Sequence, residues 1–188
     1  VGLLITPGRG PGWARVLVLA LSVLGASASA GAFNQYYERA HDRLMARTRG
    51  RAFVTGALSA SPAWLYLIGL MLVASVGVAA WVLNPVSALF VFLGAFFYGV
   101  VYTVWLKRRT WWNIVIGGLA GSFAVLAGAA AVDPSLGPLP LLLALVLFLW
   151  TPPHFWSLAI ANHADYAAAG VPMLPVVAGP ERAARIVY

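Results

Sequence analysis

The sequence contains no cysteine and few charged residues, and each shortage excludes a class of protein. Without cysteine there is no disulfide framework, no thiolate metal site and no thiol nucleophile, so a bound metal must use oxygen or imidazole ligands. Asp, Glu, Lys and Arg make up only 9% of the 188 residues, against roughly a quarter in water-soluble domains. Because 62% of the residues are hydrophobic, we expect an integral membrane protein.

The net charge of +7 raises the question of a nucleic-acid partner. The basic residues, however, stand in short clusters between long apolar runs and do not follow one face of an amphipathic element. We therefore expect a lipid bilayer, and not nucleic acid, as the environment of this chain.

Five apolar runs reach the length of about 20 residues that a membrane-spanning helix needs. The sequence therefore predicts an all-α fold, a polytopic transmembrane bundle in which residues 1–188 form one membrane-embedded domain. The chain opens on Val1 and residues 181–188 resemble the start of another helix, so we expect this domain to be truncated at both ends. The predicted spans are residues 14–33, 63–83, 86–106, 113–132 and 139–161.

The connections between these runs alternate in charge. The second connection is only Asn84-Pro85, and the fourth, residues 133–138, carries no positive charge. The positive-inside rule then places the first, third and fifth connections in the cytoplasm and residues 1–13, Arg9 included, outside. The Ala, Gly and Arg content favours a bacterial source, and hence the inner membrane. The basic residues of the three cytoplasmic connections are Arg39, Arg43, Arg47, Arg49, Arg51, Lys107, Arg108, Arg109, Arg182 and Arg185.

Two features inside the runs concern packing. Small residues at helical spacing, as close helix contact in lipid requires, recur between Gly117 and Gly128. The pair Pro152-Pro153 interrupts the fifth run and predicts a kink or an unwound turn there.

The chain has only five acidic residues, and their positions carry most of the chemical information. Asn34, Glu38 and Asp42 are spaced by four, so a helix that continues beyond the first run places them on one face, about 6 Å apart per step. A stripe of oxygen ligands suits a hard cation, and Mg²⁺ in particular combines a few carboxylates with phosphate oxygens. The alternative is local pairing at a helix end, Glu38 with Arg43 or Asp42 with Arg39.

A second polar segment, residues 162–166, follows the fifth run on the same predicted side. Its Asp165 is either an ordinary turn or cap residue, or the second of two carboxylate groups that hold metal ions and a diphosphate between them. Arginine forks match phosphate oxygens, although any cytoplasmic loop also collects Lys and Arg for topology.

Four blocks of sequence, in order between residues 34 and 179, resemble the heme O synthase branch of the UbiA superfamily of intramembrane prenyltransferases. The superfamily repeats an Asn and two acidic residues at every fourth position, as Asn34, Glu38 and Asp42 do. The blocks are NQYYERAHDRLMARTRGR, YTVWLKRRT followed by NIVIGG, LFLWTPPHFWSLAI, and DYAAAGVPMLPVVAG.

The resemblance implies a bundle of nine membrane helices, of which this chain holds about five, the second to the sixth. It implies transfer of a farnesyl group from farnesyl diphosphate to a vinyl group of protoheme (heme B), giving heme O, with Mg²⁺ as cofactor. The chemistry is compatible with these residues, because a farnesyl cation needs a water-poor chamber and its diphosphate needs metal and Arg. Heme A synthase and oxidase assembly proteins are the partners that such a role suggests.

By position, the resemblance assigns catalytic and metal-binding roles to Asn34, Glu38 and Asp42 in a first motif and to Asp165 in a second. His154 matches a family histidine that either contacts the porphyrin or is satisfied within its own helix, and we expect Tyr102 and Trp150 to be packing or interface residues. The basic positions that the resemblance assigns to diphosphate binding are Arg43, Arg47, Lys107, Arg108 and Arg109.

Two other functions fit the same sequence less well. A prenyltransferase for a quinone precursor or a chlorophyll-type ring has the same fold, but the TPPHFW and AGVPMLP text resembles the heme branch. An ion transporter also uses carboxylates, but these acids lie at helix ends beside many arginines and not in mid-bilayer.

Overall fold

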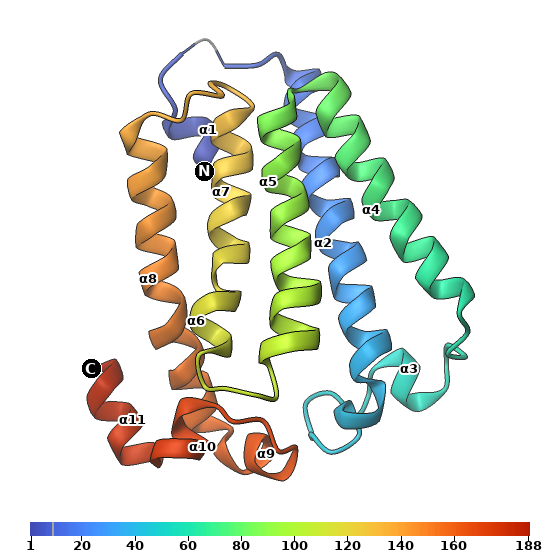
Figure 1. Ribbon diagram of the computed structural model, residues 1–188, viewed down its shortest axis with the longest axis vertical. Coiled ribbons are helices and arrows are strands. Elements are labelled where there is room, and N and C mark those ends of the chain that lie inside the picture. The colour runs from blue at the N-terminus through green and yellow to red at the C-terminus, as the bar shows by residue number, and fades with distance from the viewer. Residues whose placement is uncertain (9) are drawn as a thin grey trace.

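The computed structural model describes residues 1–8 and 10–188, so Arg9, which the charge pattern placed outside, lies outside the described residues. In these residues, five helices are long and apolar enough to cross a membrane, and they stand side by side (Figure 1). The described residues contain no strand. The prediction of an all-α polytopic bundle is confirmed. The long helices are α2 (Trp13–Asp42), α4 (Ala63–Val82), α5 (Pro85–Phe96) continued by η1 (Phe97–Leu106), α6 (Asn113–Gly117) followed by α7 (Leu119–Ala130), and α8 (Pro138–Ala161).

Short helices distinguish the two ends of the bundle. Helices α3 (Ala52–Thr55), α9 (His163–Ala168) and α10 (Leu174–Ala178) lie at the end where α2 finishes (Figure 1). Helix α11 (Pro180–Val187) follows them, whereas α1 (Gly2–Ile5) packs on α7 at the opposite end. The Arg-rich connections thus all belong to one end of the molecule.

The opposite end is closed by short caps. Asn84 begins α5 by accepting a hydrogen bond from the Ser87 amide at 2.8 Å, and Pro85 occupies the first helical turn, where its missing N–H costs nothing. Asp133 accepts from the backbone amide of Ser135 at 2.9 Å and from its hydroxyl at 2.8 Å. These two hydrogen bonds lower the pKa of Asp133 below its ordinary value.

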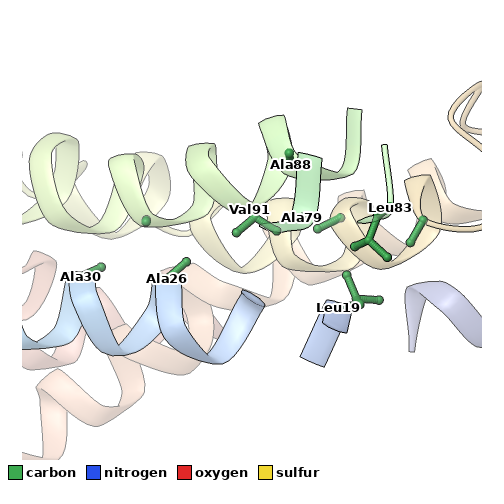
Figure 2. Close-up of a cluster of buried hydrophobic side chains, with 10 residues drawn as sticks. Leu19, Ala26, Ala30, Ala79, Leu83, Ala88 and Val91 are labelled. Carbon is green, nitrogen blue, oxygen red and sulfur yellow. The ribbon is translucent and has the colours of Figure 1, made fainter. Parts of the chain in front are cut away.

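Small residues form the contacts between helices, and large ones face outward. The core cluster of Figure 2 joins α2, α4, α5 and α7 through residues such as Ala26, Ala79 and Ala88. Large side chains on the outer faces are exposed, for example Trp81 at 88%. This arrangement is typical of a bundle in lipid, where close packing and not exclusion from water holds helices together.

Glycines at tight helix crossings confirm the small-residue pattern. A Cβ added to Gly117 would lie 2.9 Å from the Tyr102 ring of η1, and one added to Gly118 would lie 2.9 Å from the Thr151 side chain of α8. Gly121 similarly faces Leu147 of α8. Residues 117–121 therefore let three helices approach one another.

The backbone differs from the prediction in two places. A kink or an unwound turn was predicted at Pro152-Pro153; helix α8 is helical throughout Pro138–Ala161, so the unwound turn is wrong, and the kink stays a prediction. The fourth run is instead interrupted at Gly118, between α6 and α7, where the crossing with α8 is tight. The second half of the third run is a π-helix, η1, which the sequence pattern did not predict.

Candidate functional site

Helix α2 continues nine residues beyond the predicted span and ends at Asp42. Its four-residue spacing places Asn34, Glu38 and Asp42 on one inward face, as predicted. All three side chains are buried, with exposures of 3%, 1% and 2%. Buried carboxylates require cationic or hydrogen-bonding partners, and the partners define the site.

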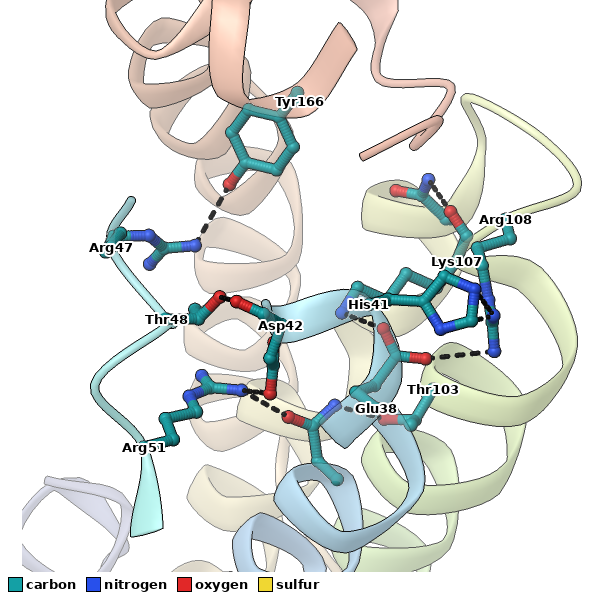
Figure 3. A network of polar contacts seen from close by, with 12 residues as sticks. Glu38, His41, Asp42, Arg47, Thr48, Arg51, Thr103, Lys107, Arg108 and Tyr166 are labelled. Atoms are coloured by element: carbon teal, nitrogen blue, oxygen red, sulfur yellow. Dashed lines mark hydrogen bonds and ion pairs between the residues drawn. The ribbon is translucent and has the colours of Figure 1, made fainter. Parts of the chain in front are cut away.

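Glu38 is paired with two cations from the turn that follows η1 (Figure 3). Its Oε2 lies 2.6 Å from Lys107 Nζ, and its Oε1 lies 3.1 Å from the Arg108 guanidinium. Arg108 also contacts the ring of His41. The alternative of a local pair between Glu38 and Arg43 is therefore wrong, because the partners come from a segment about 70 residues away.

Asp42 is paired with Arg51, which returns from the loop after α2 to its carboxylate at 2.7 Å. The same guanidinium nitrogen donates to Asn34 Oδ1 at 3.4 Å, so two oxygens of the stripe converge on one positive group (Figure 3). Thr48 holds the loop in place by donating to the backbone oxygen of Asp42 at 2.8 Å. Arg51 was not predicted as a site residue, because a loop arginine is explained by topology alone.

The π-helix η1 sets which of its residues face this stripe. Nine residues make two and a half turns of an α-helix, which would turn Tyr98 and Lys107 to opposite sides. In a helix with i→i+5 hydrogen bonds, such as that from Lys107 N–H to Tyr102 O at 2.8 Å, nine residues make about two turns. Tyr98, Tyr102 and Lys107 consequently all line the same cavity.

That cavity, of about 440 Å³, is polar at one end and apolar at the other. Its polar wall comes from α2 and the two Arg-rich connections, and its apolar wall from η1, α6, α7 and α8. The arrangement suits a ligand with a charged head and a hydrophobic body. The polar wall includes Asn34, Asp42, Arg47, Thr48, Arg51 and Lys107, and the apolar wall includes Tyr98, Tyr102, Leu147, Trp150 and Phe155.

A second cavity, of about 380 Å³, adjoins the first deeper in the bundle. The two share Tyr98, Ala120 and Gly121 in their walls. The rest of the second cavity is lined largely by small and apolar residues of α2, α5 and α7, such as Ala26, Gly94 and Ala124. The small residues of α7 therefore serve both packing and the cavity.

The other predicted residues are distributed unevenly around this site. Arg47 lines the cavity and donates to the Tyr166 hydroxyl at 3.4 Å, which links the first loop to α9. Asp165, next to Tyr166 on α9, is partly exposed and is not part of the cavity wall. Arg43 and Arg109 are exposed and also lie outside the wall. Helix α9, which carries Asp165, lies at the end of the bundle where α2 finishes (Figure 1).

Three further ring side chains had predictions from sequence, two of them on α8 and one on η1. His154 is exposed and its ring is stacked on Trp150, with centroids 4.3 Å apart. The described residues give its ring no hydrogen-bond partner, and the two interpretations, contact with a porphyrin and a histidine satisfied within its own helix, both stay predictions. Trp150 and Tyr102 were predicted to be packing or interface residues. Trp150 is 55% exposed and Tyr102 packs against the buried cluster that includes Ile114 and Trp156, and both also line the cavity.

The oxygen ligands of the stripe fit Mg²⁺, provided that a ligand brings oxygens of its own. In the part of the chain that the structure describes, no three His, Asp or Glu side chains converge as a protein-only metal site would require. Mg²⁺ usually takes one or two carboxylates plus phosphate oxygens and water. Asn34 and Asp42, beside a cavity with Arg47, Arg51 and Lys107, fit that pattern.

Comparison with known protein families gives one match along the whole chain. The model of the UbiA prenyltransferase family matches residues 1–188. The chain is 61% identical over 186 residues to protoheme IX farnesyltransferase 2 of Paramagnetospirillum magneticum, and the match covers 99% of this chain and 65% of that protein. It is 55% identical over 170 residues to protoheme IX farnesyltransferase 1 of the same organism, and this match covers 90% of this chain and 59% of that protein. The chain thus spans less than two thirds of these curated relatives.

Among solved structures, the chain is similar to a UbiA homolog from Archaeoglobus fulgidus bound to DMAPP and Mg²⁺. The TM-score is 0.85 with 24% sequence identity, and the match covers 100% of this chain and 66% of that one. The same homolog bound to GPP and Mg²⁺ gives a TM-score of 0.84. At this identity the likeness concerns the fold, and it agrees with the helix order described above.

Proposed function

The chain belongs to the UbiA prenyltransferase family, and from this premise we propose that it acts in the transfer of a farnesyl group from farnesyl diphosphate to a vinyl group of protoheme, giving heme O. The names of relatives up to 61% identical support the two substrates. The observation that carries the proposal is the 440 Å³ cavity, whose charged wall passes into an aromatic and aliphatic one. A farnesyl diphosphate has the same division into a charged head and an apolar tail.

We assign the diphosphate to the polar wall. Arg47, Arg51 and Lys107 line it, and their N–H groups can donate charge-assisted hydrogen bonds to phosphate oxygens. Lys107 and Arg51 are paired with Glu38 and Asp42, so binding would exchange a carboxylate partner for a phosphate one. Of the remaining predicted basic residues, Arg108 acts through Glu38, and Arg43 and Arg109 are candidates for the entry of the anion.

We assign the metal to the stripe on α2, where Asn34, Glu38 and Asp42 would hold Mg²⁺ together with oxygens of the diphosphate. Mg²⁺ bound there supplies positive charge that stabilises the departing diphosphate. Asp165 remains our candidate for the second motif, from the partly exposed start of α9. The residues of the chain then orient the head group so that the carbon–oxygen bond to be broken points toward the apolar wall.

Ionisation of that bond leaves an allylic cation that water would destroy. The apolar wall and the adjoining 380 Å³ cavity are lined mostly by aliphatic, aromatic and small side chains, which exclude water and accommodate the tail. The electron pair of the broken bond leaves with diphosphate, and the π electrons of the acceptor vinyl group form the new carbon–carbon bond. This leaves positive charge on the vinyl carbon next to the porphyrin, where one water molecule then adds through its oxygen and gives up a proton. His154, stacked on the cavity residue Trp150, is our candidate for contact with the porphyrin ring.

The proposal is tested by supplying farnesyl diphosphate, protoheme and Mg²⁺ to membranes that contain the protein and analysing the hemes by mass spectrometry. We expect farnesylated heme, and we expect Asp42→Asn to lower its rate of formation by about 100-fold or more, the order seen when one preorganised electrostatic group is lost. The matched control is Asp133→Asn at the opposite end of the bundle, where the carboxylate accepts hydrogen bonds from Ser135. It should retain activity.

The outcomes separate the parts of the proposal. Absence of farnesylated heme with the protein in the membrane and an active reference enzyme would overturn the reaction. Product from a quinone precursor instead of protoheme would change the acceptor alone. Full activity of Asp42→Asn would remove the metal assignment. We also propose that the protein lies in a bacterial inner membrane with this end in the cytoplasm.

A further inference from the structure

One buried hydroxyl beside the site has no role in the account above. Thr103 lies on η1 with 1% of its surface exposed and is not part of the cavity wall. Its Oγ1 donates to the backbone oxygen of Tyr98 at 2.8 Å and accepts from Asn34 Nδ2 at 3.0 Å. It therefore connects the π-helix to the first residue of the stripe (Figure 3).

These contacts determine which way the Asn34 amide faces. A threonine hydroxyl has a single hydrogen, and here it goes to Tyr98, so the oxygen can only accept from the Asn34 NH₂ group. On the other side of the amide, Arg51 lies 3.4 Å from Oδ1, and a guanidinium can only donate. Both neighbours impose the same orientation, in which Asn34 Oδ1 points toward Arg51 and away from Thr103.

The orientation matters because an asparagine can ligate Mg²⁺ only through its oxygen. Asn34 Oδ1 and Asp42 Oδ2 already converge on one cationic nitrogen, at 3.4 and 2.7 Å. We propose that Thr103 is a positioning residue that holds the Asn34 amide so that its oxygen is presented, beside Asp42, to a metal–diphosphate head group. This inference rests on the proposed function, which makes Asn34 a ligand.

The π-helix is what brings the hydroxyl to this place. The Thr103 hydroxyl bonds to a carbonyl five residues earlier in the chain, the spacing of the i→i+5 backbone ladder of η1. Replacement by valine keeps the shape and the β-branching but removes the hydroxyl, leaving the buried Asn34 NH₂ without its acceptor. Replacement by serine keeps both hydrogen bonds.

The test measures binding of Mn²⁺, as a paramagnetic substitute for Mg²⁺, to the purified protein at a fixed concentration of inorganic diphosphate. The loss of the free Mn²⁺ resonance signal reports the affinity. We expect Thr103→Val to weaken binding by about 10-fold or more, as loss of an outer-shell partner of a metal ligand does, and Thr103→Ser to bind like the unaltered protein. The matched control is Ser87→Ala, which removes a fully buried hydroxyl bonded to Ala127 O at 2.9 Å, far from the site.

A double variant decides whether Thr103 acts through Asn34. If it does, Thr103→Val has no further effect on affinity in an Asn34→Ala background, whereas an effect on η1 alone would persist there. Unchanged affinity of Thr103→Val while Asn34→Ala binds weakly, or an equal loss in both backgrounds, would overturn the inference and leave the proposed function standing. Unchanged affinity of Asn34→Ala would overturn the inference together with the assignment of Asn34 as a metal ligand. The melting temperature of each variant shows that it is folded.

Discussion

At the scale of single residues, the site consists of buried charges that would be strongly unfavourable in a membrane protein without partners of opposite charge. Glu38 and Asp42 have exposures of 1% and 2%, and each carboxylate lies within 2.7 Å of a cation. A buried ion pair adds little net stability, but a carboxylate left without its partner is strongly destabilising. The pairs therefore keep the charged stripe assembled and ready for a ligand that can exchange partners with it.

The ion pair between Lys107 and Glu38 gives a prediction about stability. Lys107→Met leaves Glu38 with Arg108 alone, so we expect a loss of about 1–3 kcal/mol, less than the cost of a fully unpaired buried charge. Adding Glu38→Gln should restore part of the lost stability, because glutamine carries no buried negative charge that needs a cationic partner. Thermal unfolding in detergent, followed by tryptophan fluorescence, measures both effects.

The control for this measurement is Arg109→Met, two residues away and exposed, which should leave the melting temperature unchanged. Two results would contradict this prediction: the same melting temperature for Lys107→Met as for the unaltered protein, or a further loss of stability when Glu38→Gln is added. In either case the ion pair between Lys107 and Glu38 would not stabilise the fold as described.

At the scale of elements, the register of η1 and the break at Gly118 shape the cavity together. The π-helix turns Tyr98, Tyr102 and Lys107 to one side. Gly117 and Gly118 then allow α6 and α7 to lie against Tyr102 and Thr151 with almost no space between. Irregular backbone is tolerated in a membrane only where it is buried in protein or lines a cavity, and both irregular segments here line the cavity.

The crossing at Gly118 predicts that even one added methyl group is destabilising. In Gly118→Ala the new Cβ would lie 2.9 Å from Thr151 and 3.0 Å from the backbone oxygen of Ile114. We expect overpacking to cost about 1–3 kcal/mol and to lower the melting temperature and the affinity for diphosphate. Gly69→Ala in α4 is the matched control, since nothing lies within 4 Å of its Cβ. A loss in both variants would assign the effect to glycine itself and not to the crossing.

At the scale of the whole molecule, polarity is concentrated at one end. All three salt bridges found in residues 1–8 and 10–188 belong to the end with α3, α9 and α10. The opposite end has short caps and the acidic turn at Asp133. The outer faces between them are apolar, so the bundle has a defined orientation across a membrane before any ligand is considered.

This orientation can be tested directly, because the chain has no cysteine and an introduced one is the only thiol. In Thr55→Cys and Ala164→Cys the new side chain lies in exposed segments at the site end, and in Ser135→Cys it lies at the opposite end. We expect a membrane-impermeant maleimide to label Ser135→Cys in intact spheroplasts, and the other two only after the membrane is opened. Labelling of Thr55→Cys and Ala164→Cys from different sides would contradict the shared end on which the site depends.

Much of the site was accessible from sequence because helical periodicity is local. The four-residue spacing of Asn34, Glu38 and Asp42 predicted one face, and the helix does continue to Asp42. The partners of these residues were not accessible, because Arg51, Lys107 and Thr103 reach the stripe through loops and a π-helix that no spacing rule describes. Pairing by proximity in sequence gave the wrong partners for both carboxylates.

The sequence by itself determined that this protein is a helical membrane bundle with five long apolar helices and one basic, acid-bearing end, because hydropathy, helix length and loop charge act along the chain. Only the tertiary structure decided which cation faces which carboxylate, which aromatic residues line the cavity and where the backbone breaks. The physical reason is that those features depend on contacts between residues up to 119 positions apart, as in the bond from Arg47 to Tyr166. Such contacts exist only once the helices have packed.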